Sequence, residues 1–345
     1  MNEDPPRLGL TMGDPAGIGP EIILKSLELL RARAAAGELV PLVVGTASCI
    51  AESAARLGLA IELTSAAGPA PWPKVRVVEA AAAQAPIEPG QLSAEGGRLA
   101  FAAIERAVRL ALSGEIDAIV TAPINKEALN AAGYAYAGHT EILAELTGST
   151  GSCMLLAHDR LRVSHVTTHV ALAEVPRRIT PERLRRVFEL THQAMLDLGI
   201  ERPRIGVCAL NPHAGEGGLF GREDVDVILP VIEEFRARGL AFEGPVPGDT
   251  VFVKALGGQF DAVVAMFHDQ GHVAVKTLGF AMDPATGRMS ALSGVNVTLG
   301  LPIVRTSVDH GTAFDIAGRG IANPQSMLEA IDFALRLVGA RRGRR

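Results

Sequence analysis

The 345-residue sequence lacks any apolar run long enough to span a bilayer, and residues 1–7 do not have the pattern of a signal peptide. It has only three cysteines, Cys49, Cys153 and Cys208, which are scattered and form no CxxC pair. We expect them to be buried thiols in a reducing compartment and not metal ligands. These absences predict a soluble, cytoplasmic protein with no membrane partner.

An excess of positive charge is also missing. The chain has 33 lysines and arginines against 38 acidic residues, and its net charge of −5 argues against a nucleic-acid partner. The basic residues 341–345 are interpreted as a solvated chain end and not as a binding arm. The sequence contains no GxGxxG turn, no P-loop and no internal repeat, so the common nucleotide signatures do not locate a cofactor.

What is present is an alternation of strand-like and helix-like segments. The length predicts two domains. Short apolar, branched runs at residues 8–12, 40–44, 75–78 and 117–120 are separated by helical patterns. This alternation predicts an α/β protein with a mostly parallel sheet covered by helices. Ligands in such sheets gather at the carboxyl ends of the strands, so polar residues at those positions are the candidates for a site.

Three such groups are ambiguous by themselves. Residues 13–21, GDPAGIGPE, follow the first strand and precede a helix, the layout that approaches phosphates, yet a simple tight turn fits equally well. Lys126 follows the strand at 117–120 but is more readily explained as an exposed structural lysine. His139 and Thr140 open a helix, where they could bind an anion or simply belong to a helix cap.

Three histidines, His169, His213 and His268, lie at or just beyond predicted strand ends. His268 begins the segment HDQGH, residues 268–272, directly after the buried run 260–267. Three neutral imidazoles with open positions suit Zn²⁺ or a similar divalent ion that acts as a Lewis acid. Each histidine alone is more often a core or capping residue, and it is the occurrence of all three at strand ends that favours a metal site.

The strand that carries His169 is expected at residues 161–169, paired in a hairpin with residues 153–157. Its β-branched content excludes a helix, so His165 and His169 are not a helical zinc pair. On a strand they share a face, and only one of them is expected to bind metal.

Other polar residues complete a possible anion site. Lys276, Asn296 and Arg305 offer donors suited to a phosphate or a carboxylate. Asp249 lies in a loop before a helix, where Asp249 or Thr250 is expected to cap that helix, although Asp249 could act in the site instead. Residues 281–294, rich in Gly, Ser and Met, are expected to form a mobile loop near the site. The combination fits chemistry on a small anionic hydroxy acid.

Five segments of the sequence, in order, resemble the 4-hydroxythreonine-4-phosphate dehydrogenase family, the PdxA family of pyridoxal phosphate biosynthesis. They are GDPAGIGPE at 13–21, GHTE at 138–141, NPHAGE at 211–216, HDQG at 268–271 and RTSVDHGTA at 305–313. The resemblance covers nearly the whole chain. The first segment and residues 310–324 are also similar to parts of isocitrate and isopropylmalate dehydrogenases, which oxidise a β-hydroxy acid with a nicotinamide cofactor and then release CO₂.

The resemblance implies a two-domain α/β/α sandwich like that of isocitrate and isopropylmalate dehydrogenases. Residues 1–127 and 306–345 would form the cofactor-side domain, and residues 128–305 the metal, substrate and dimerisation domain. The active site would lie in the cleft between the two domains. This fold does not place its cofactor on a GxGxxG turn, which explains why that motif is missing.

The resemblance also implies roles for individual residues. One divalent metal per site, Zn, Mg, Co or Mn, would be held by His169, His213 and His268, with His268 donated across a homodimer interface. The substrate and its phosphate would contact His139, Thr140, Lys276, Asn296 and Arg305. The cofactor would contact His310, Gly311, Thr312, Ala313, Asp315 and Asn323. The Asp315 carboxylate would repel a 2′-phosphate, which favours NAD, with NADP as the alternative. Lys276 and Asp249 are the candidates for the general base.

Two departures from the family pattern concern the substrate. Members devoted to pyridoxal phosphate synthesis have Gly-Leu-Pro where this chain has Gly271-His272-Val273, and they lack most of the 281–294 segment. The chain looks more similar to the branch that oxidises and decarboxylates 4-phospho-D-threonate or 4-phospho-D-erythronate.

The predicted function is therefore NAD- and metal-dependent oxidation, with β-decarboxylation, of a phosphorylated C4 β-hydroxy acid. The candidate substrates are 4-hydroxy-L-threonine 4-phosphate and 4-phospho-D-threonate or -erythronate. One alternative is oxidation of the cis-dihydrodiol of terephthalate, which a further relative carries out. An alternative of another class is a non-catalytic metal- or phosphate-binding protein that has kept the fold.

Overall fold

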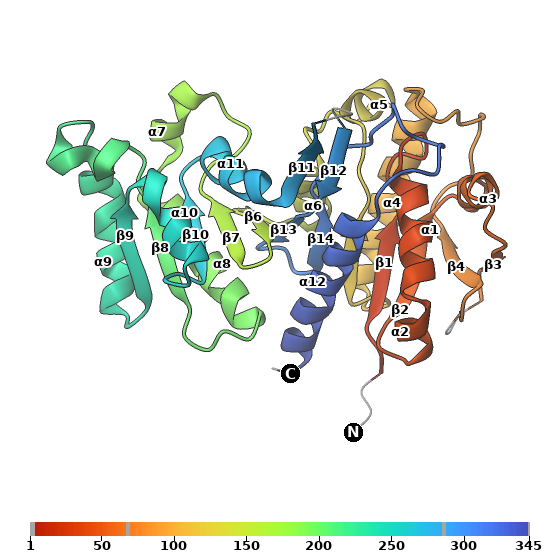
Figure 1. The fold of residues 1–345 in the computed structure, drawn as a ribbon, viewed down its shortest axis with the longest axis horizontal. Helices are drawn as coiled ribbons and strands as arrows, with labels where there is room; N and C mark the ends of the chain where they lie inside the picture. Colours follow the sequence, from red (N-terminus) through yellow and green to blue (C-terminus); the bar gives the residue numbers. More distant parts are fainter. Residues whose placement is uncertain (1–3, 67–69, 285–287, 344–345) are drawn as a thin grey trace. The chain divides into compact units, whose positions relative to one another are not determined.

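The structure, a computed structural model, describes residues 4–66, 70–284 and 288–343. The chain folds into two compact units (Figure 1). Unit 1 contains Met1–Ser149 and Leu301–Arg342, and unit 2 contains Thr150–Gly300 with Gly343–Arg345. Both units combine strands and helices, as predicted. In the described part of the chain, no helix is long and apolar enough to cross a membrane.

The sheet of unit 1 is entirely parallel. Its strand order is β3-β4-β2-β1-β5-β14, and every pair of neighbours runs in the same direction. The strands are β1 (Arg7–Thr11), β2 (Val40–Gly45), β3 (Glu62–Thr64), β4 (Lys74–Glu79), β5 (Ala118–Thr121) and β14 (Val304–Val308). The strands predicted in this unit are confirmed, whereas the three-residue edge strand β3 carries too short a pattern to be recognised in the sequence.

Helices cover both faces of the unit 1 sheet (Figure 1). They are α1 (Gly19–Leu29), α2 (Arg31–Ala35), α3 (Ala47–Arg56), α4 (Ala94–Leu112), α5 (Lys126–Ala131), α6 (His139–Thr147) and α12 (Gln325–Arg342). Helix α12 packs along β14 and β5 and touches α1. Helix α4 packs on β1, β2 and β5, where Ile104 joins Leu42 and Ile119 in a buried cluster.

The boundary between the units differs from the domain limits expected from the resemblance. Residues 128–149 belong to unit 1, because Ile142 and Leu143 of α6 are fully buried in the same apolar cluster as Ile104 of α4. Leu301 and Ile303 join that cluster as well, so the chain enters unit 1 before residue 306.

The sheet of unit 2 is mixed. Its strand order is β13-β6-β7-β10-β8-β9, in which β6 runs antiparallel to β13 and β7 and the remaining pairs are parallel. The strands are β6 (Cys153–His158), β7 (Leu161–His165), β8 (Arg204–Cys208), β9 (Ala241–Val246), β10 (Ala262–Ala265) and β13 (Val295–Leu299). The predicted hairpin is confirmed, but β7 ends at His165 and not at His169. The chain leaves the sheet after Thr167, so His169 is exposed beyond it.

Helices also pack on the unit 2 sheet. They are α7 (Val175–Arg178), α8 (Pro181–Asp197), α9 (Leu229–Ala237), α10 (Gly248–Leu256) and α11 (His268–Gly279), with short helical turns η1 (Leu172–Glu174), η2 (Pro212–Gly218) and η3 (Asp224–Ile228). Helix α8 meets α9 through the rings of Phe188 and Phe235, whose centroids are 5.3 Å apart. Helices α10 and α11 contribute to a second cluster around Val163, Val263 and Val275.

Two local predictions in unit 2 are wrong. The segment expected to be a mobile loop at 281–294 instead contains parts of an antiparallel pair, β11 (Phe280–Asp283) and β12 (Arg288–Leu292), while residues 285–287 of that prediction lie outside the described residues. Asp249 and Thr250 do not cap α10 with their side chains. That helix begins at Gly248, and Pro247 occupies the capping position without a side-chain hydrogen bond.

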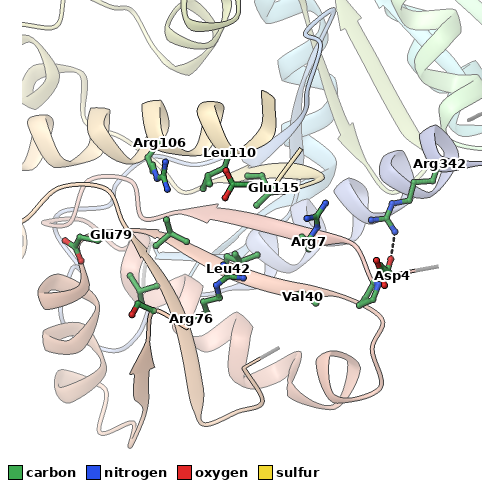
Figure 2. Close-up of a pocket in the computed structure, with 15 residues that line it drawn as sticks. Asp4, Arg7, Val40, Leu42, Arg76, Glu79, Arg106, Leu110, Glu115 and Arg342 are labelled. Atoms are coloured by element: carbon green, nitrogen blue, oxygen red, sulfur yellow. Dashed lines mark hydrogen bonds between the residues drawn. The ribbon is translucent and has the colours of Figure 1, made fainter. Parts of the chain in front are cut away.

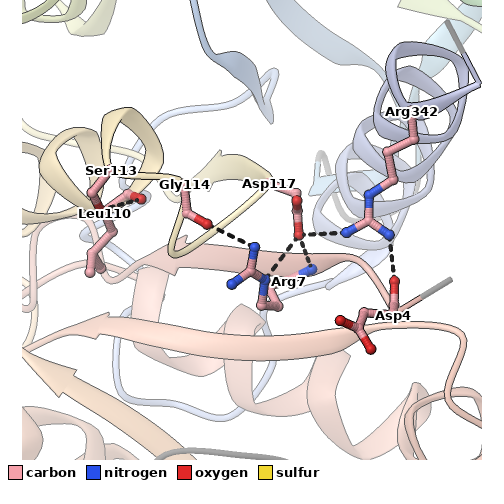
Figure 3. Close-up of polar contacts among 7 residues, drawn as sticks. All are labelled: Asp4, Arg7, Leu110, Ser113, Gly114, Asp117 and Arg342. Carbon is pink, nitrogen blue, oxygen red and sulfur yellow. Dashed lines mark hydrogen bonds and ion pairs between the residues drawn. The ribbon is translucent and has the colours of Figure 1, made fainter. Parts of the chain in front are cut away.

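Three distant segments of unit 1 meet at Asp117 (Figure 3). The backbone N–H of Arg7 donates to Asp117 Oδ2 at 2.8 Å, and the Arg342 guanidinium lies 3.0 Å from the same oxygen. Arg342 also donates to the carbonyl of Asp4. Arg341 donates to the Pro302 carbonyl, so these two members of the basic tail are part of the folded unit and not a frayed end, while Arg344 and Arg345 lie outside the described residues.

A pocket of about 770 Å³ lies beside β2, β4 and α4 in unit 1 (Figure 2). Arg76, Arg106, Glu79 and Glu115 contribute charged groups to its wall, and Leu42 contributes to its apolar floor. None of the residues predicted for the functional site lines this pocket.

Candidate functional site

The carboxyl ends of β8 and β10 in unit 2 are tied together by Gln270, in the first turn of α11. Its side-chain Oε1 accepts a hydrogen bond from the Met266 N–H at 2.7 Å, and its Nε2 donates to the Ala209 carbonyl at 2.8 Å. Both groups lie just past strand ends, so the amide fixes where α11 begins relative to β8. His268, the first residue of α11, is thereby held at the strand ends, as predicted.

His268 already has a partner for one ring nitrogen. Its Nδ1 lies 2.7 Å from Asp269 Oδ1, and the imidazole is partly exposed. A carboxylate at Nδ1 favours a proton on that nitrogen and leaves Nε2 as the lone pair able to bind a cation. His169 lies close by, with 5.6 Å between the two ring centroids.

Two further histidines lie behind His268. Burial and the neighbouring His272 lower the pKa of His165 to about 3, and burial and His268 lower the pKa of His272 to about 4. Both rings are therefore neutral at physiological pH. In the sequence His272 is part of the HDQGH segment, which suits a metal site, and a departure from a family pattern, but spacing does not show its place in the helix interior.

His213 lies on a backbone turn that few side chains adopt. Residues 213–217 all have positive φ, including 52° at His213 and 45° at Glu216. Asp224, which is 1% exposed, anchors the start of this turn by accepting the N–H groups of Leu210 and Asn211 at 2.8 and 3.0 Å. Backbone strain of this kind, supported by a buried carboxylate, is common at functional sites.

The structure therefore brings together His268 and His169 but not all three predicted ligands. Among the residues described, one chain contains no group of three or more His, Cys, Asp or Glu side chains able to hold a metal. The donor types still fit a divalent cation: His169 and His213 are exposed, and His268 has Nε2 available beside its Asp269 partner. Within one chain, His169 lies beside His268, whereas His213 lies on the separate turn η2.

The other predicted residues of unit 2 lie on separate elements. Asn296 is on β13, and its Oδ1 is buried without a hydrogen-bond partner among the residues described. Lys276 is on α11, with Nζ 5.1 Å from the centre of the Phe280 ring. Asp249 is exposed in the first turn of α10. A buried amide oxygen that lacks a donor is suited to a hydroxyl-bearing ligand.

In unit 1, Arg305 and His139 are buried and form an arrangement suited to an anion. Arg305 lies on β14, is 3% exposed and donates to the Thr121 hydroxyl at 2.7 Å. Burial lowers the pKa of Arg305 to about 9. Burial and the Arg305 charge lower the pKa of His139 well below its ordinary value, and His139 Nε2 is buried without a partner among the described atoms. A cation that burial disfavours to this extent would be stabilised by an anion.

His139 and Thr140 are in the first turn of α6, as predicted. Gly138 occupies the capping position, so His139 and Thr140 follow it and are not the capping residue, and α6 begins without a side-chain cap hydrogen bond. This favours the anion-site interpretation over the capping interpretation that the sequence left open.

The two segments that resemble isocitrate and isopropylmalate dehydrogenases lie side by side in unit 1. Ile18 N–H donates to the Thr312 carbonyl at 3.0 Å, and a Cβ on Gly17 would lie 2.9 Å from Thr312. Lys25 joins the two segments again by donating to Glu21 at 2.8 Å and to the Ala322 carbonyl at 2.8 Å. The GDPAGIGPE turn therefore supports the 310–323 segment, where the cofactor residues were predicted.

Asp14 is a candidate that sequence reasoning missed. It is 1% exposed, Oδ1 accepts the Ala16 N–H at 2.9 Å, and Oδ2 has no hydrogen-bond partner among the described residues. Burial raises the pKa of Asp14 to about 6, against the smaller opposing effect of the Ala16 hydrogen bond. A buried carboxyl at the carboxyl end of β1 with such a pKa is typical of a functional site. The glycine-rich turn was the only signal of it in the sequence.

Fold and site together define an α/β protein with a buried arginine on a strand of one unit and a histidine group at strand ends in the other. A family profile described as pyridoxal phosphate biosynthetic protein PdxA matches residues 38–334. The chain belongs to the PdxA family.

Two curated relatives and one solved structure show what the chain is similar to. A Bradyrhizobium diazoefficiens protein with the provisional name D-threonate 4-phosphate dehydrogenase is 61% identical, over 96% of both chains. A D-threonate 4-phosphate dehydrogenase of Cupriavidus necator is 47% identical, over 96% of this chain and 97% of the relative. The crystal structure of a 4-hydroxythreonine-4-phosphate dehydrogenase from Klebsiella pneumoniae is 41% identical, with a TM-score of 0.81 over 96% of this chain and 99% of that one. These relatives are named as dehydrogenases, which supports an oxidoreductase.

Proposed function

We propose that the protein oxidises and decarboxylates D-threonate 4-phosphate with NAD and a divalent metal, on a two-domain fold of the isocitrate and isopropylmalate dehydrogenase type. The proposal of a phosphorylated substrate rests on the buried Arg305 beside His139. Because burial disfavours the charge of the guanidinium, a phosphate dianion bound there would stabilise it strongly. The two D-threonate 4-phosphate dehydrogenase names among the most similar relatives favour this substrate over 4-hydroxythreonine 4-phosphate.

Different residues would bind the phosphate, the hydroxyl and the carboxylate of the substrate. Arg305, His139 and Thr140 would hold the phosphate oxygens, with the N-terminal turn of α6 adding its free N–H groups. Asn296 would hold a substrate hydroxyl through its buried Oδ1, and Lys276 would contact the carboxylate. These contacts orient the C3 hydroxyl before reaction, which is the main contribution that binding groups make to the rate.

The metal would be held by His169 and His213 of one subunit and by His268 of the other in a homodimer. A bound divalent ion would supply Lewis acidity at the substrate oxygen, which favours loss of the hydroxyl proton and the negative charge that develops as CO₂ is lost. Asp269 holds Nδ1 of His268, and Asp224 holds the turn that carries His213, so both ligands are supported by carboxylates.

Oxidation requires a base and a hydride acceptor. Asp249 would take the hydroxyl proton if Lys276, as an ammonium, holds the carboxylate, and a neutral Lys276 would be the base if it does not. NAD would supply the hydride acceptor for C3. The product is a β-keto acid whose C1–C2 bond breaks to release CO₂. Asp315, exposed in the 310–323 segment, would accept from the ribose hydroxyls and disfavour a 2′-phosphate.

The test is NADH formation at 340 nm with Mg²⁺, Mn²⁺, Co²⁺ or Zn²⁺ and a substrate panel. The panel contains D-threonate 4-phosphate, D-erythronate 4-phosphate, 4-hydroxythreonine 4-phosphate and the terephthalate dihydrodiol. We expect the first to give the highest kcat/KM and to yield NADH, CO₂ and dihydroxyacetone phosphate in equal amounts. Absence of turnover with every member, in protein shown to bind metal, would favour the non-catalytic alternative.

A further inference from the structure

His268 lies face to face with another histidine one helical turn further along α11. The centroids of His268 and His272 are 3.6 Å apart and their planes differ by 11°. His272 Nδ1 lies 3.0 Å from the His268 carbonyl oxygen, so it is the donor and its ring orientation is fixed. A stack this close constrains the ring of His268 on one side.

His272 is itself held from behind. His165, at the end of β7 and fully buried, lies with its ring centroid 4.8 Å from that of His272. A Cβ placed on Gly271 would lie only 2.3 Å from His165 Nε2 and 2.8 Å from Val163, so only glycine allows α11 to approach β7 this closely. The contacts place His165, His272 and His268 in one row that leads from the core of unit 2 to its strand ends.

We propose that His272 is a positioning residue for His268. The inference rests on the proposed role of His268 as a metal ligand. The stack stops rotation of the His268 ring about its Cβ–Cγ bond, and Asp269 holds its Nδ1. Nε2 of His268 therefore points in one direction before a cation binds. Cation binding then does not have to include the entropy cost of ordering the ring.

His272 has two features that can be tested separately, its aromatic ring and its Nδ1 hydrogen bond, and substitution by alanine removes both. His272→Phe keeps an aromatic ring against His268 and loses the Nδ1 hydrogen bond, whereas His272→Ala loses both. The His268 carbonyl can still accept the backbone N–H of residue 272 in either variant, because the two residues are one helical turn apart. His192→Phe, in α8, is the matched control, because the His192 ring contacts Phe242 and not the row.

Two measurements test the proposal. The first is the Co²⁺ dissociation constant of each purified protein by chelator competition, together with the visible Co²⁺ spectrum. We expect His272→Ala to bind Co²⁺ about tenfold or more weakly with an altered spectrum, and His272→Phe to recover most of the affinity. The second uses metal-free protein: the Cε1–H resonance of His268 should be shifted upfield by the neighbouring ring in wild type and His272→Phe, but not in His272→Ala.

The outcomes distinguish this inference from the proposed function. If wild type binds Co²⁺ and His272→Ala binds it within threefold, or if His272→Phe is no better than His272→Ala, the positioning role is refuted while the metal site stands. If wild type binds no Co²⁺, the metal assignment and the role built on it both fail. A His268 resonance that does not change between wild type and His272→Ala would overturn the stacking constraint directly.

Discussion

At the scale of single residues, the structure adds reasons that spacing cannot supply. The sequence located His268 and His213 near strand ends because apolar runs precede them, and both do follow strands. It could not show that Asp224 anchors the His213 turn, or that His165 and His272 lie behind His268, since those contacts join residues distant in the chain or hidden inside a helix. Asp14 is part of the GDPAGIGPE motif, but the sequence does not show its burial, which depends on the packing of other elements.

The buried carboxyl of Asp14 should make stability fall as pH rises. Its pKa is raised to about 6 in the folded protein, above the ordinary value of 3.8, so the folded state binds the extra proton between those pH values. Ionising it costs about 3 kcal/mol above pH 6, from two pKa units at about 1.4 kcal/mol each. Asp14→Asn should therefore be more stable than wild type by about 1–3 kcal/mol at pH 8 and similar at pH 4, as measured by urea unfolding.

The same experiment contains its own control, because Asn can still accept the Ala16 N–H through Oδ1. A stability difference that is the same at pH 4 and pH 8 would refute the raised pKa. If Asp14 also acts in the reaction, Asp14→Asn will combine higher stability with lower kcat, which is the trade-off expected of a functional buried carboxyl.

Arg305 should not be replaceable by lysine. The guanidinium is buried and donates to Thr121, and a lysine there would lose its charge readily and could not form two parallel hydrogen bonds to a phosphate. We expect Arg305→Lys to lower kcat/KM for D-threonate 4-phosphate by about 10- to 100-fold, mainly through KM, in steady-state assays. The exposed Lys126 at the start of α5 provides the control: Lys126→Ala should leave KM unchanged, and an equal loss in both variants would contradict an anion site at Arg305.

At the scale of elements, the alternation of strands and helices was predictable and the exceptions have identifiable causes. Strand β7 ends at His165 because the chain separates from β10 after Thr167. This is a tertiary effect, and the β-branched residues up to His169 predicted a longer strand. The hairpin of β11 and β12 was interpreted as a loop because its composition resembles one. Helix α10 begins at Gly248 without a side-chain cap. The preference for Asp or Thr at helix starts predicted the capping residue at Asp249 or Thr250, which is two or three residues beyond the observed position.

The turn η2 should depend on Asp224. This carboxylate accepts the Leu210 and Asn211 N–H groups, and its loss would leave two backbone donors without their partner beside a strained turn. We expect Asp224→Ala to lower the free energy of unfolding by about 2–3 kcal/mol and to weaken Co²⁺ binding about 10- to 100-fold. Thermal unfolding and metal titration measure the two effects.

A neighbouring aspartate serves as the control for that change. Asp226, two residues further on, is exposed and pairs with Arg222 at 2.8 Å. Asp226→Ala should leave both stability and Co²⁺ affinity nearly unchanged, because exposed ion pairs contribute little. Equal effects of the two substitutions would show that η2 does not need the Asp224 anchor.

At the scale of the whole molecule, length and alternation predicted two α/β units, and the family resemblance implied that the first is discontinuous. In the structure α6 belongs to unit 1, and the contacts that bind Ile142 and Leu143 to α4 have no local signature in the sequence. The subunit-shared metal site, the cofactor and the substrate came from resemblance and stay proposals, since they concern groups and partners that no single chain contains.

The Asp117 network should contribute to stability above pH 4 and be lost below it. Burial tends to raise the pKa of Asp117, but hydrogen bonds from the Arg7 N–H and from the Arg342 and Arg7 side chains together lower it below 3.8. The unfolded chain therefore binds the proton first as pH falls, and the stabilisation disappears through that lower range. Asp117→Asn should lower the melting temperature at pH 7, and its difference from wild type should shrink between pH 4 and pH 2.

The control is an ion pair of the same unit that lies on the surface. Glu105→Gln, which removes the Arg109 partner at 3.2 Å, should change the melting temperature little at any pH. A difference between Asp117→Asn and wild type that stays constant down to pH 2 would contradict a lowered pKa at Asp117.

The discontinuity of unit 1 has a consequence for the order in which the protein is made. Strand β14, which pairs with β5, and α12, which packs on both, follow residues 150–300 in the chain and are therefore synthesised after them. The sheet of unit 2 is built from a continuous stretch and is complete in the nascent chain earlier. During the synthesis of unit 2, the β5 edge that pairs with β14 and the face that α12 covers are therefore exposed, which favours chaperone binding to this part of the chain during translation.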